Sequence, residues 1–471
     1  MKKLHYTIIL FIFLGPLAIG QKLVLKKGEI IEGLAVNDST KSTFSLYLPT
    51  NFRTDTEWPL LMVFDVEGKE KQAISMFVPA AEKEGYILAA PKMVDSLSLT
   101  NNMLLTGKTM EEVVNMLPIK QGRVYAAGSS AGGRFATLVP IFIKGVKGAI
   151  SIGASLANRE LLNIKSPFHF IGMVGKDNYE YTSMLTDTKL LDKMKFPNQM
   201  LLFDGGNDWP SFDYLEKGLQ LFTLDAMGRK LIPKDSAYVE KAYQEDLAKL
   251  NQLKNIGDLL WAEQYMTEMM SIYGAHKNLD SLRLVQKELR KDKQFRSMKR
   301  NENSAFLKES MLKEDYQYYM EEDIYTHNFN NLGWWNHQRG EIKKFMTGTD
   351  PFEKEMGHRL LGFVNALAED YIDLVRSDEV VDEDALAFLY MLKTILEPEN
   401  FEYYLKTISL SAKNEDFGTS LFYLEEAFKK GFKDREKLYT LEGTALFRIT
   451  PEFNELVSKY LKDALYEIDE N

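Results

Sequence analysis

Short apolar segments alternate with longer amphipathic stretches through the first half of the chain. Segments this short, rich in Val, Ile, Leu and Phe and bounded by turn residues, predict buried strands. Their alternation with helical stretches is typical of a mostly parallel sheet with crossover helices, so we expect an α/β fold. The predicted strands are 43–48, 60–64, 86–90, 124–127, 148–152, 168–174 and 199–203.

The pattern changes near residue 230, and beyond Pro233 it is almost wholly helical. Apolar residues recur there at helical spacing in long stretches such as 238–250, 259–273 and 401–411. A chain of 471 residues is longer than one core of ordinary size organises. We therefore expect an α/β domain at residues 21–230 and an all-α domain at residues 235–471.

The first twenty residues have the pattern of an export signal. Two lysines precede an apolar stretch at 6–19, and the small residues Ala18 and Gly20 offer a cleavage site. The stretch is shorter than a membrane-spanning helix needs, although a signal anchor is the alternative. The chain has no cysteine, which removes disulfides and a lipid-bearing cysteine. We interpret residues 1–20 as a signal peptide and the mature protein as secreted or periplasmic.

A Gly-x-Ser-x-Gly motif at 128–132 is the most informative feature for chemistry. The apolar run 124–127 breaks at the first glycine and a helical pattern follows, which predicts a sharp turn between strand and helix. Such a turn lifts Ser130 out of the sheet edge as a candidate nucleophile. The backbone amide of Ala131 would then point where an oxyanion forms.

Two further positions follow later predicted strands in the same way. Asp177 comes after the run 168–174, and Asn207 comes after the run ending at Phe203. Serine, acid and base follow this chain order in α/β-hydrolases. Residues 40–225 resemble that superfamily, and look closest to secreted bacterial esterases of the polyhydroxybutyrate-depolymerase and feruloyl-esterase type. In those enzymes a Gly-Gly-His-x-Trp-Pro segment commonly supplies the base, and it is matched here by Gly205, Gly206, Trp209 and Pro210.

The resemblance implies an α/β-hydrolase fold in which Ser130 is the nucleophile and Asp177 orients the base. It also implies two oxyanion donors, Ala131 and Val66. The base position, however, holds Asn207, and an amide cannot take a proton from a serine.

A second departure follows the predicted strand 60–64. The family often shows His-Gly there, whereas this chain has Asp-Val-Glu-Gly at 65–68. Two carboxylates would lie near the developing negative charge and oppose it unless they turn away.

Other histidines and acids give weaker indications. His169 lies inside a predicted strand and is interpreted as a core residue, whereas His337 beside two tryptophans is the more suggestive replacement base. Glu355 and His358 share a helix face, but no second copy of this spacing completes a metal site. We therefore expect neither a metal nor another cofactor.

The helical half contains one resemblance of its own. Residues 401–430 look like a tetratricopeptide helical pair, with Tyr404, Ser420, Leu424 and Ala427 at its large and small positions. Stacked pairs of this kind leave a groove that could hold a peptide or cover the hydrolase cleft. A purely structural appendage is the alternative.

Charge and motifs together indicate the class of function. The net charge of −10 argues against nucleic acid or an anionic membrane as the main partner. The leading hypothesis is an exported serine-esterase-like protein whose catalysis is lost or weakened, and which binds an ester-bearing or glycan-linked small molecule or a protein partner. One alternative is an active carboxylic-ester hydrolase that uses Ser130 with a base from elsewhere. Another is a helical interaction module on a hydrolase scaffold.

Overall fold

The computed structural model describes residues 25–36, 41–93, 98–207 and 209–462, so the predicted signal peptide at 1–20 lies outside it. Eight strands form one sheet in the order β1-β2-β4-β3-β5-β6-β7-β8. The β1–β2 and β2–β4 pairs are antiparallel, and all other neighbours are parallel. The strands are β1 (Ile30–Ala35), β2 (Thr43–Tyr47), β3 (Trp58–Phe64), β4 (Ile87–Pro91), β5 (Ile119–Ser129), β6 (Val146–Ile152), β7 (His169–Gly175) and β8 (Asn198–Phe203).

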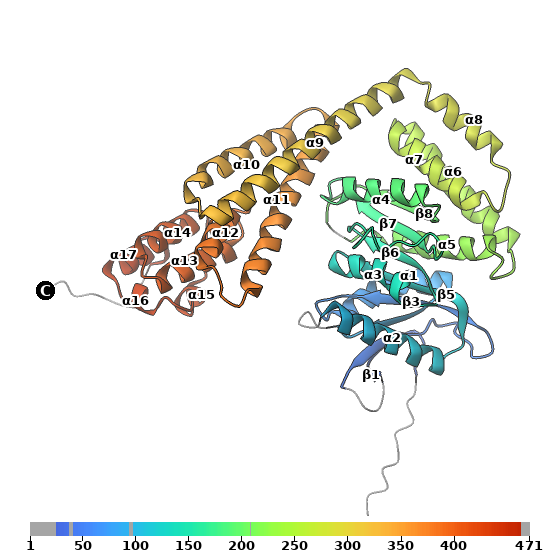
Figure 1. Ribbon diagram of the computed structural model, residues 1–471, viewed down its shortest axis with the longest axis horizontal. Helices are drawn as coiled ribbons and strands as arrows, with labels where there is room; N and C mark the ends of the chain where they lie inside the picture. Colours follow the sequence, from blue (N-terminus) through green and yellow to red (C-terminus); the bar gives the residue numbers. More distant parts are fainter. Residues whose placement is uncertain (1–24, 37–40, 94–97, 208, 463–471) are drawn as a thin grey trace, which may run out of the picture.

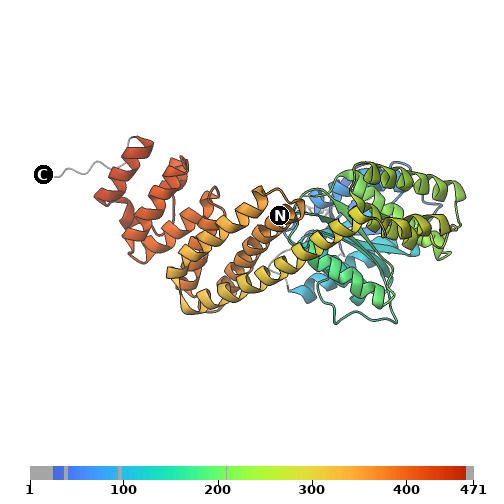
Figure 2. The ribbon, with the colours of Figure 1, turned by 90° about the horizontal axis from the view of Figure 1, so that it is seen from above.

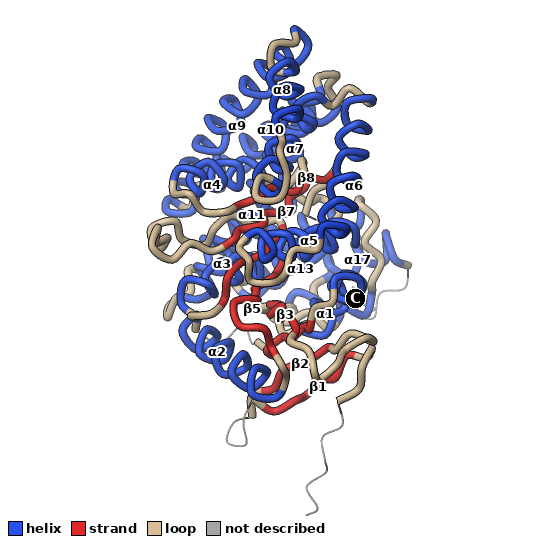
Figure 3. Tube along the Cα trace, turned by 90° about the vertical axis from the view of Figure 1, so that its right-hand side faces the viewer, coloured by secondary structure: helices blue, strands red, loops and turns tan. Residues whose placement is uncertain are grey.

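Helices cover both faces of this sheet (Figure 3). Helices α1 (Glu70–Glu84) and α5 (Phe212–Gly228) contact each other on one face. Helices α2 (Leu99–Met116), α3 (Ala131–Phe142) and α4 (Tyr181–Lys193) lie on the other. Strands β3, β4, β7 and β8 are buried along their whole length, as expected for parallel strands covered on both sides. The α/β-hydrolase fold predicted from the sequence is confirmed.

The hydrophobic core of the sheet continues past residue 235. Helices α6 (Ser236–Asn255), α7 (Leu259–Tyr273) and α8 (Asp280–Leu289) follow α5, and α7 contacts both β8 and α5. Their buried side chains, among them Val239, Trp261 and Leu282, belong to the same core cluster as the strands. The proposed boundary at 230–235 stays a prediction, but the buried side chains of these three helices continue the core of the sheet half.

A long helix leads from the sheet half into the rest of the chain. Helix α9 (Lys293–Thr326) is about 50 Å long at 1.5 Å per residue. It packs with α10 (Leu332–Thr347), α11 (Pro351–Ser377) and α12 (Glu383–Leu396) around a second core that contains Tyr316, Trp335 and Leu360. A 3₁₀ turn, η1 (Phe329–Asn331), connects α9 to α10. A largely helical C-terminal region is therefore present, as predicted.

The last helices form a third core at the end of the molecule far from the sheet (Figures 1 and 2). They are α13 (Phe401–Lys413), α14 (Phe417–Lys429), α15 (Arg435–Tyr439), α16 (Ala445–Arg448) and α17 (Pro451–Leu461). The residues matched to the tetratricopeptide pattern are all buried between α13 and α14 or beside them. Gly431, at φ 104°, lies just past the end of α14, where Phe432 N–H donates to Ala427 O at 3.0 Å. The resemblance to a tetratricopeptide pair stays a prediction.

Aspartates fix the starting points of the helices that carry the second core. Asp292 accepts hydrogen bonds from the backbone at the start of α9, Asp350 does so for α11, and Asp382 for α12. Each satisfies amides that the helix itself leaves without partners. Within the described ranges, none of the helices has the length and apolar character that crossing a membrane requires.

Candidate active site

Ser130 occupies the turn between β5 and α3 in a strained conformation. Its backbone has φ 51° and ψ −123°, a left-handed region that costs a non-glycine residue on the order of 1–3 kcal/mol. The Ser130 N–H donates to Ile152 O of β6 at 2.9 Å, and its carbonyl accepts from Arg134 N at 3.0 Å. The side chain is exposed and does not cap α3. The predicted sharp turn between strand and helix is therefore present, with Ser130 exposed on it, and the role of Ser130 as nucleophile stays a prediction.

Close backbone packing around the elbow requires glycine at two positions. A Cβ on Gly128 would lie 2.3 Å from Gly132 O, and a Cβ on Gly132 would lie 2.3 Å from Phe64 O. Neither contact is possible without moving backbone, because the obstructing atoms are carbonyl oxygens. The second contact also shows that the loop after β3 lies directly beside the elbow.

We expect Gly132→Ala to lower the free energy of unfolding by about 1–3 kcal/mol, because the added methyl forces α3 away from the end of β3. Urea denaturation measures this loss. Gly340→Ala in helix α10 is the matched control, since a Cβ on Gly340 would meet no atom within 4 Å. This control should leave stability unchanged or raise it by about 0.5–1 kcal/mol. Equal effects of both substitutions would contradict the packing described for the elbow.

The two carboxylates of the loop after β3 have partners within that loop. Asp65 accepts from Glu67 N at 3.0 Å and from Lys69 N at 2.9 Å, so its side chain folds back over its own loop. Glu67 is exposed and pairs with Lys69. The Asp65 carboxylate is therefore held by its own loop, and the charge of Glu67 is paired. Val66, the predicted second oxyanion donor, lies half-buried in this loop.

Asp177 lies directly after β7, where its N–H donates to Gly205 O in the loop after β8 at 2.9 Å. Its side chain is half-buried, and among the described residues no hydrogen bond to the carboxylate is present. Burial raises the pKa of Asp177, and the positive charges of His358 and Arg359 act in the opposite direction. The carboxylate thus lies in an environment shared with helix α11.

Asn207 follows β8 in an exposed loop, and its amide has no hydrogen-bond partner in the part of the chain that the structure covers. Trp209, from the same segment, packs edge-on against Phe77 of α1 with ring centroids 6.2 Å apart. The matched tryptophan of this segment therefore has a packing role here.

The three predicted site positions lie at one edge of the sheet. Ser130, Asp177 and Asn207 follow the parallel strands β5, β7 and β8 at their carboxyl ends. Between the first two, a Cβ on Gly153 would lie 3.0 Å from Asn178 Nδ2, which shows how closely the loops meet. Within the described residues, however, no hydrogen bond joins any two of the three side chains. The structure brings the positions together without forming a hydrogen-bonded triad.

Residues of the helical half also reach this edge, which sequence reasoning missed. Arg359 of α11 donates from Nη1 to Lys176 O at 2.8 Å, and it pairs with Glu309 of α9 at 2.8 Å. The side chains of this pair are each 1% exposed. Lys313 of α9 donates to Tyr179 O at 2.9 Å. No short motif reveals contacts between residues more than 130 positions apart, so only the folded chain shows them.

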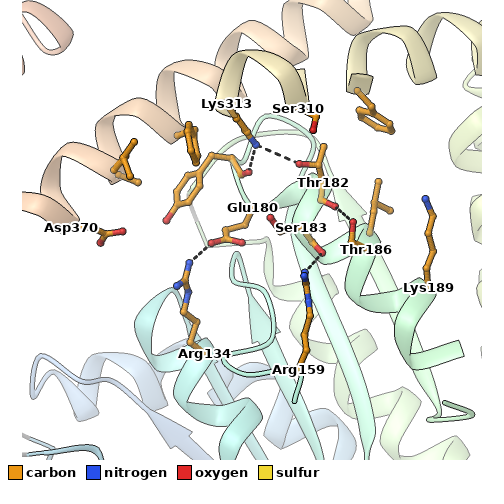
Figure 4. A pocket seen from close by; sticks show the side chains of 16 residues that line it. Arg134, Arg159, Glu180, Thr182, Ser183, Thr186, Lys189, Ser310, Lys313 and Asp370 are labelled. Atoms are coloured by element: carbon orange, nitrogen blue, oxygen red, sulfur yellow. Dashed lines mark hydrogen bonds and ion pairs between the residues drawn. The ribbon is translucent and has the colours of Figure 1, made fainter. Parts of the chain in front are cut away.

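A cavity of about 510 Å³ lies between the two halves beside the elbow helix (Figure 4). Arg134, one turn after Ser130, pairs there with the buried Glu180. Asp370 projects from α11 toward the same space, and burial raises its pKa while the charge of Arg134 lowers it. Lys189 and Lys313 add positive charge to the lining. The cavity is thus polar and suited to a ligand that carries hydrogen-bonding groups.

The other residues that the sequence offered as candidates pack against or pair with neighbouring side chains. His169 is buried in β7 and contacts Gln199. His337 is exposed on α10, with Nε2 3.8 Å from Glu341. Trp335 is buried and donates to Asp323 at 2.8 Å, which is interhelical packing. Across the described residues no group of three or more His, Cys, Asp or Glu side chains is arranged to hold a metal ion.

No protein-family model and no curated protein matches the chain. Solved structures match the sheet half at a distance. An S-formylglutathione hydrolase from Staphylococcus aureus is 15% identical, with a TM-score of 0.34, over 43% of this chain and 98% of that one. A ferulic acid esterase is 14% identical, with a TM-score of 0.34, over 41% and 97%. An esterase from Pyrobaculum calidifontis is 10% identical, with a TM-score of 0.36, over 43% and 87%.

Proposed function

We propose that the chain is an exported serine-esterase-like protein that keeps its nucleophile elbow but has lost most of its catalysis. It would act by binding an ester-bearing or glycan-linked small molecule, or a protein partner. The observation that carries the proposal is Ser130, exposed and held at φ 51°, beside a base position occupied by Asn207. The elbow is suited to attack on a carbonyl, whereas position 207, where the resembled family has its base, holds no histidine.

The size of the catalytic loss follows from the chemistry of the hydroxyl. A serine hydroxyl is a poor nucleophile until a base takes its proton, and an amide side chain has no basic nitrogen. Removing the histidine from a well-studied serine protease lowers turnover about a millionfold. Even partial compensation would leave a slow enzyme.

The strained elbow and the neighbouring cavity support a role in binding. Holding Ser130 at positive φ costs stability, and strain of this kind persists mainly where a site uses it. The cavity beside Arg134 offers about 510 Å³ and charged groups of both signs. A protein or peptide partner could use the helical region, whose tetratricopeptide-like pair α13–α14 is part of the same proposal. We propose neither a cofactor, nor a nucleic acid, nor a membrane as partner after signal cleavage.

Turnover of p-nitrophenyl acetate tests the proposal. We expect a wild-type kcat at least about a hundredfold below the usual range, which begins near 1 s⁻¹. Ser130→Ala provides the background rate, and whatever activity remains should disappear with it. Wild-type turnover of ordinary size that Ser130→Ala abolishes would contradict the loss of catalysis.

A further inference from the structure

Helix α11 lies along the loop that carries Asp177. Arg359 Nη1 is 2.8 Å from Lys176 O. A Cβ on Gly362 would be 3.4 Å from the Cβ of Tyr179. The helix and the loop therefore run side by side, with residue 359 next to 176 and residue 362 next to 179. Asp177 follows Lys176 directly, so it lies beside the turn of α11 that contains Arg359.

His358 is the histidine that this arrangement brings to the site. It precedes Arg359 and lies four residues before Gly362, so it lies on nearly the same side of the helix as Gly362. The effect on the pKa of Asp177, which burial raises and a charge on His358 lowers, agrees with this position on the helix. His358 is exposed, and in the described structure neither its ring nor the Asp177 carboxylate has a hydrogen-bond partner. Both groups are free to pair with each other.

The spacing of the strand ends accommodates an imidazole. Ser129 of β5, Ile152 of β6 and Met173 of β7 lie side by side in the sheet, so the ends of β5 and β7 are about 10 Å apart, and Asp177 follows Met173 by four residues. The Ser130 N–H reaches Ile152 O at the end of β6, which holds the elbow at this edge. A carboxylate, an imidazole and a hydroxyl joined by two hydrogen bonds of about 2.8 Å span a gap of this size.

We propose that His358, supplied by helix α11, is the general base for Ser130 in place of the histidine missing at position 207, and that Asp177 orients it. The inference rests on the proposed function, in which Ser130 is the nucleophile of a weak ester hydrolase. It assigns the helical region a direct part in the chemistry. No sequence motif points to His358 as a base, because the base of the resembled family follows β8.

The proton and the electron pairs balance at each step. One ring nitrogen of His358 takes the proton of Ser130 as Oγ attacks the ester carbon, and the carbonyl π electrons move to the oxygen. When this oxyanion collapses, the bond to the alcohol breaks and the leaving oxygen takes the proton from the imidazolium. The acyl group remains on Ser130. Water then gives a proton to the imidazole as it attacks the acyl carbon. When this second oxyanion collapses, the bond to Oγ breaks, Ser130 regains its proton from the imidazolium, and the free acid leaves.

Covalent labelling of Ser130 by a fluorophosphonate probe tests the proposal, because even slow labelling is measurable by intact mass. We expect His358→Gln to slow labelling about 10²-fold, the smaller end of the effect of general-base catalysis. His337→Gln is the matched control, an exposed histidine on α10, and should label at the wild-type rate. Ser130→Ala should not label at all.

A double variant separates loss of the base from loss of the fold. Adding Asn207→His to His358→Gln returns a base to the position that follows β8, and should restore labelling if the site is intact. Wild-type labelling of the His358→Gln protein would overturn the inference, as would a wild-type Ser130 that never labels. Ordinary ester turnover that depends on His358 would instead support the inference and overturn only the proposed loss of catalysis.

Discussion

In the His358→Gln background, Asn207→His raises kcat/KM for p-nitrophenyl acetate by about 10²-fold or more. The substitution places an imidazole after β8, in the loop whose Gly205 O already accepts from Asp177 N at 2.9 Å. A positioned general base contributes about 10²–10⁴-fold to such a reaction. Asn207 is exposed, so the larger side chain does not disturb the core.

Three further variants isolate the cause of this gain. In the same background, Asn207→Gln changes the side chain without adding a base and should leave the rate unchanged. Adding Ser130→Ala to Asn207→His should abolish the gain, and adding Asp177→Asn should reduce it, because the new imidazole loses its orienting carboxylate. A gain that survives loss of Ser130 would mean that the introduced histidine acts alone, and would remove the support for the elbow as the reacting centre.

Arg359→Ala lowers the free energy of unfolding by about 3 kcal/mol, the lower end for a broken buried pair. Arg359 and Glu309 are each 1% exposed, and removal of Arg359 leaves the buried Glu309 carboxylate with Lys313, at 2.8 Å, as its remaining partner. The same substitution removes the hydrogen bond to Lys176 O that ties α11 to the sheet half. Urea denaturation followed by tryptophan fluorescence measures the loss.

Lys308→Ala is the control for this substitution. Lys308 pairs with Glu353 at 2.9 Å and joins the same two helices, but these side chains are 44% and 42% exposed. An exposed pair contributes at most about 1 kcal/mol, so the control should change stability little. If both substitutions cost the same, burial of the Arg359–Glu309 pair is not what stabilises the junction.

The fold and the elbow could be predicted from the sequence because both follow from local patterns. Buried parallel strands such as β7 give continuous apolar runs, and the glycines around Ser130 report a turn that other residues could not adopt. The carboxyl-edge placement of Asp177 and Asn207 follows from their position after parallel strands. Each of these inferences needs only a few neighbouring residues.

The parts that the sequence did not reveal depend on packing between distant segments. An amphipathic pattern shows that α6 and α7 bury one face, but not that this face joins the core of the sheet. In the sequence, the spacing of Glu355 and His358 indicates only a weak metal-binding motif. In the fold, partial burial of Glu355 against the sheet half raises the pKa of its carboxyl group to about 7. The direction of the Asp65 side chain is set by hydrogen bonds within its own loop. The pattern of charged residues along the sequence does not predict such packing or side-chain directions.

A crystal structure of the protein with a phosphonate bound to Ser130 gives the most direct test, through the distance from Ser130 Oγ to the nearest imidazole nitrogen. The account predicts that Ser130 keeps positive φ, that Asn207 makes no proton-accepting contact, and that the nearest imidazole is His358, within hydrogen-bond reach or one water molecule. A different histidine within about 3.2 Å of Oγ, or a Ser130 with negative φ, would contradict it.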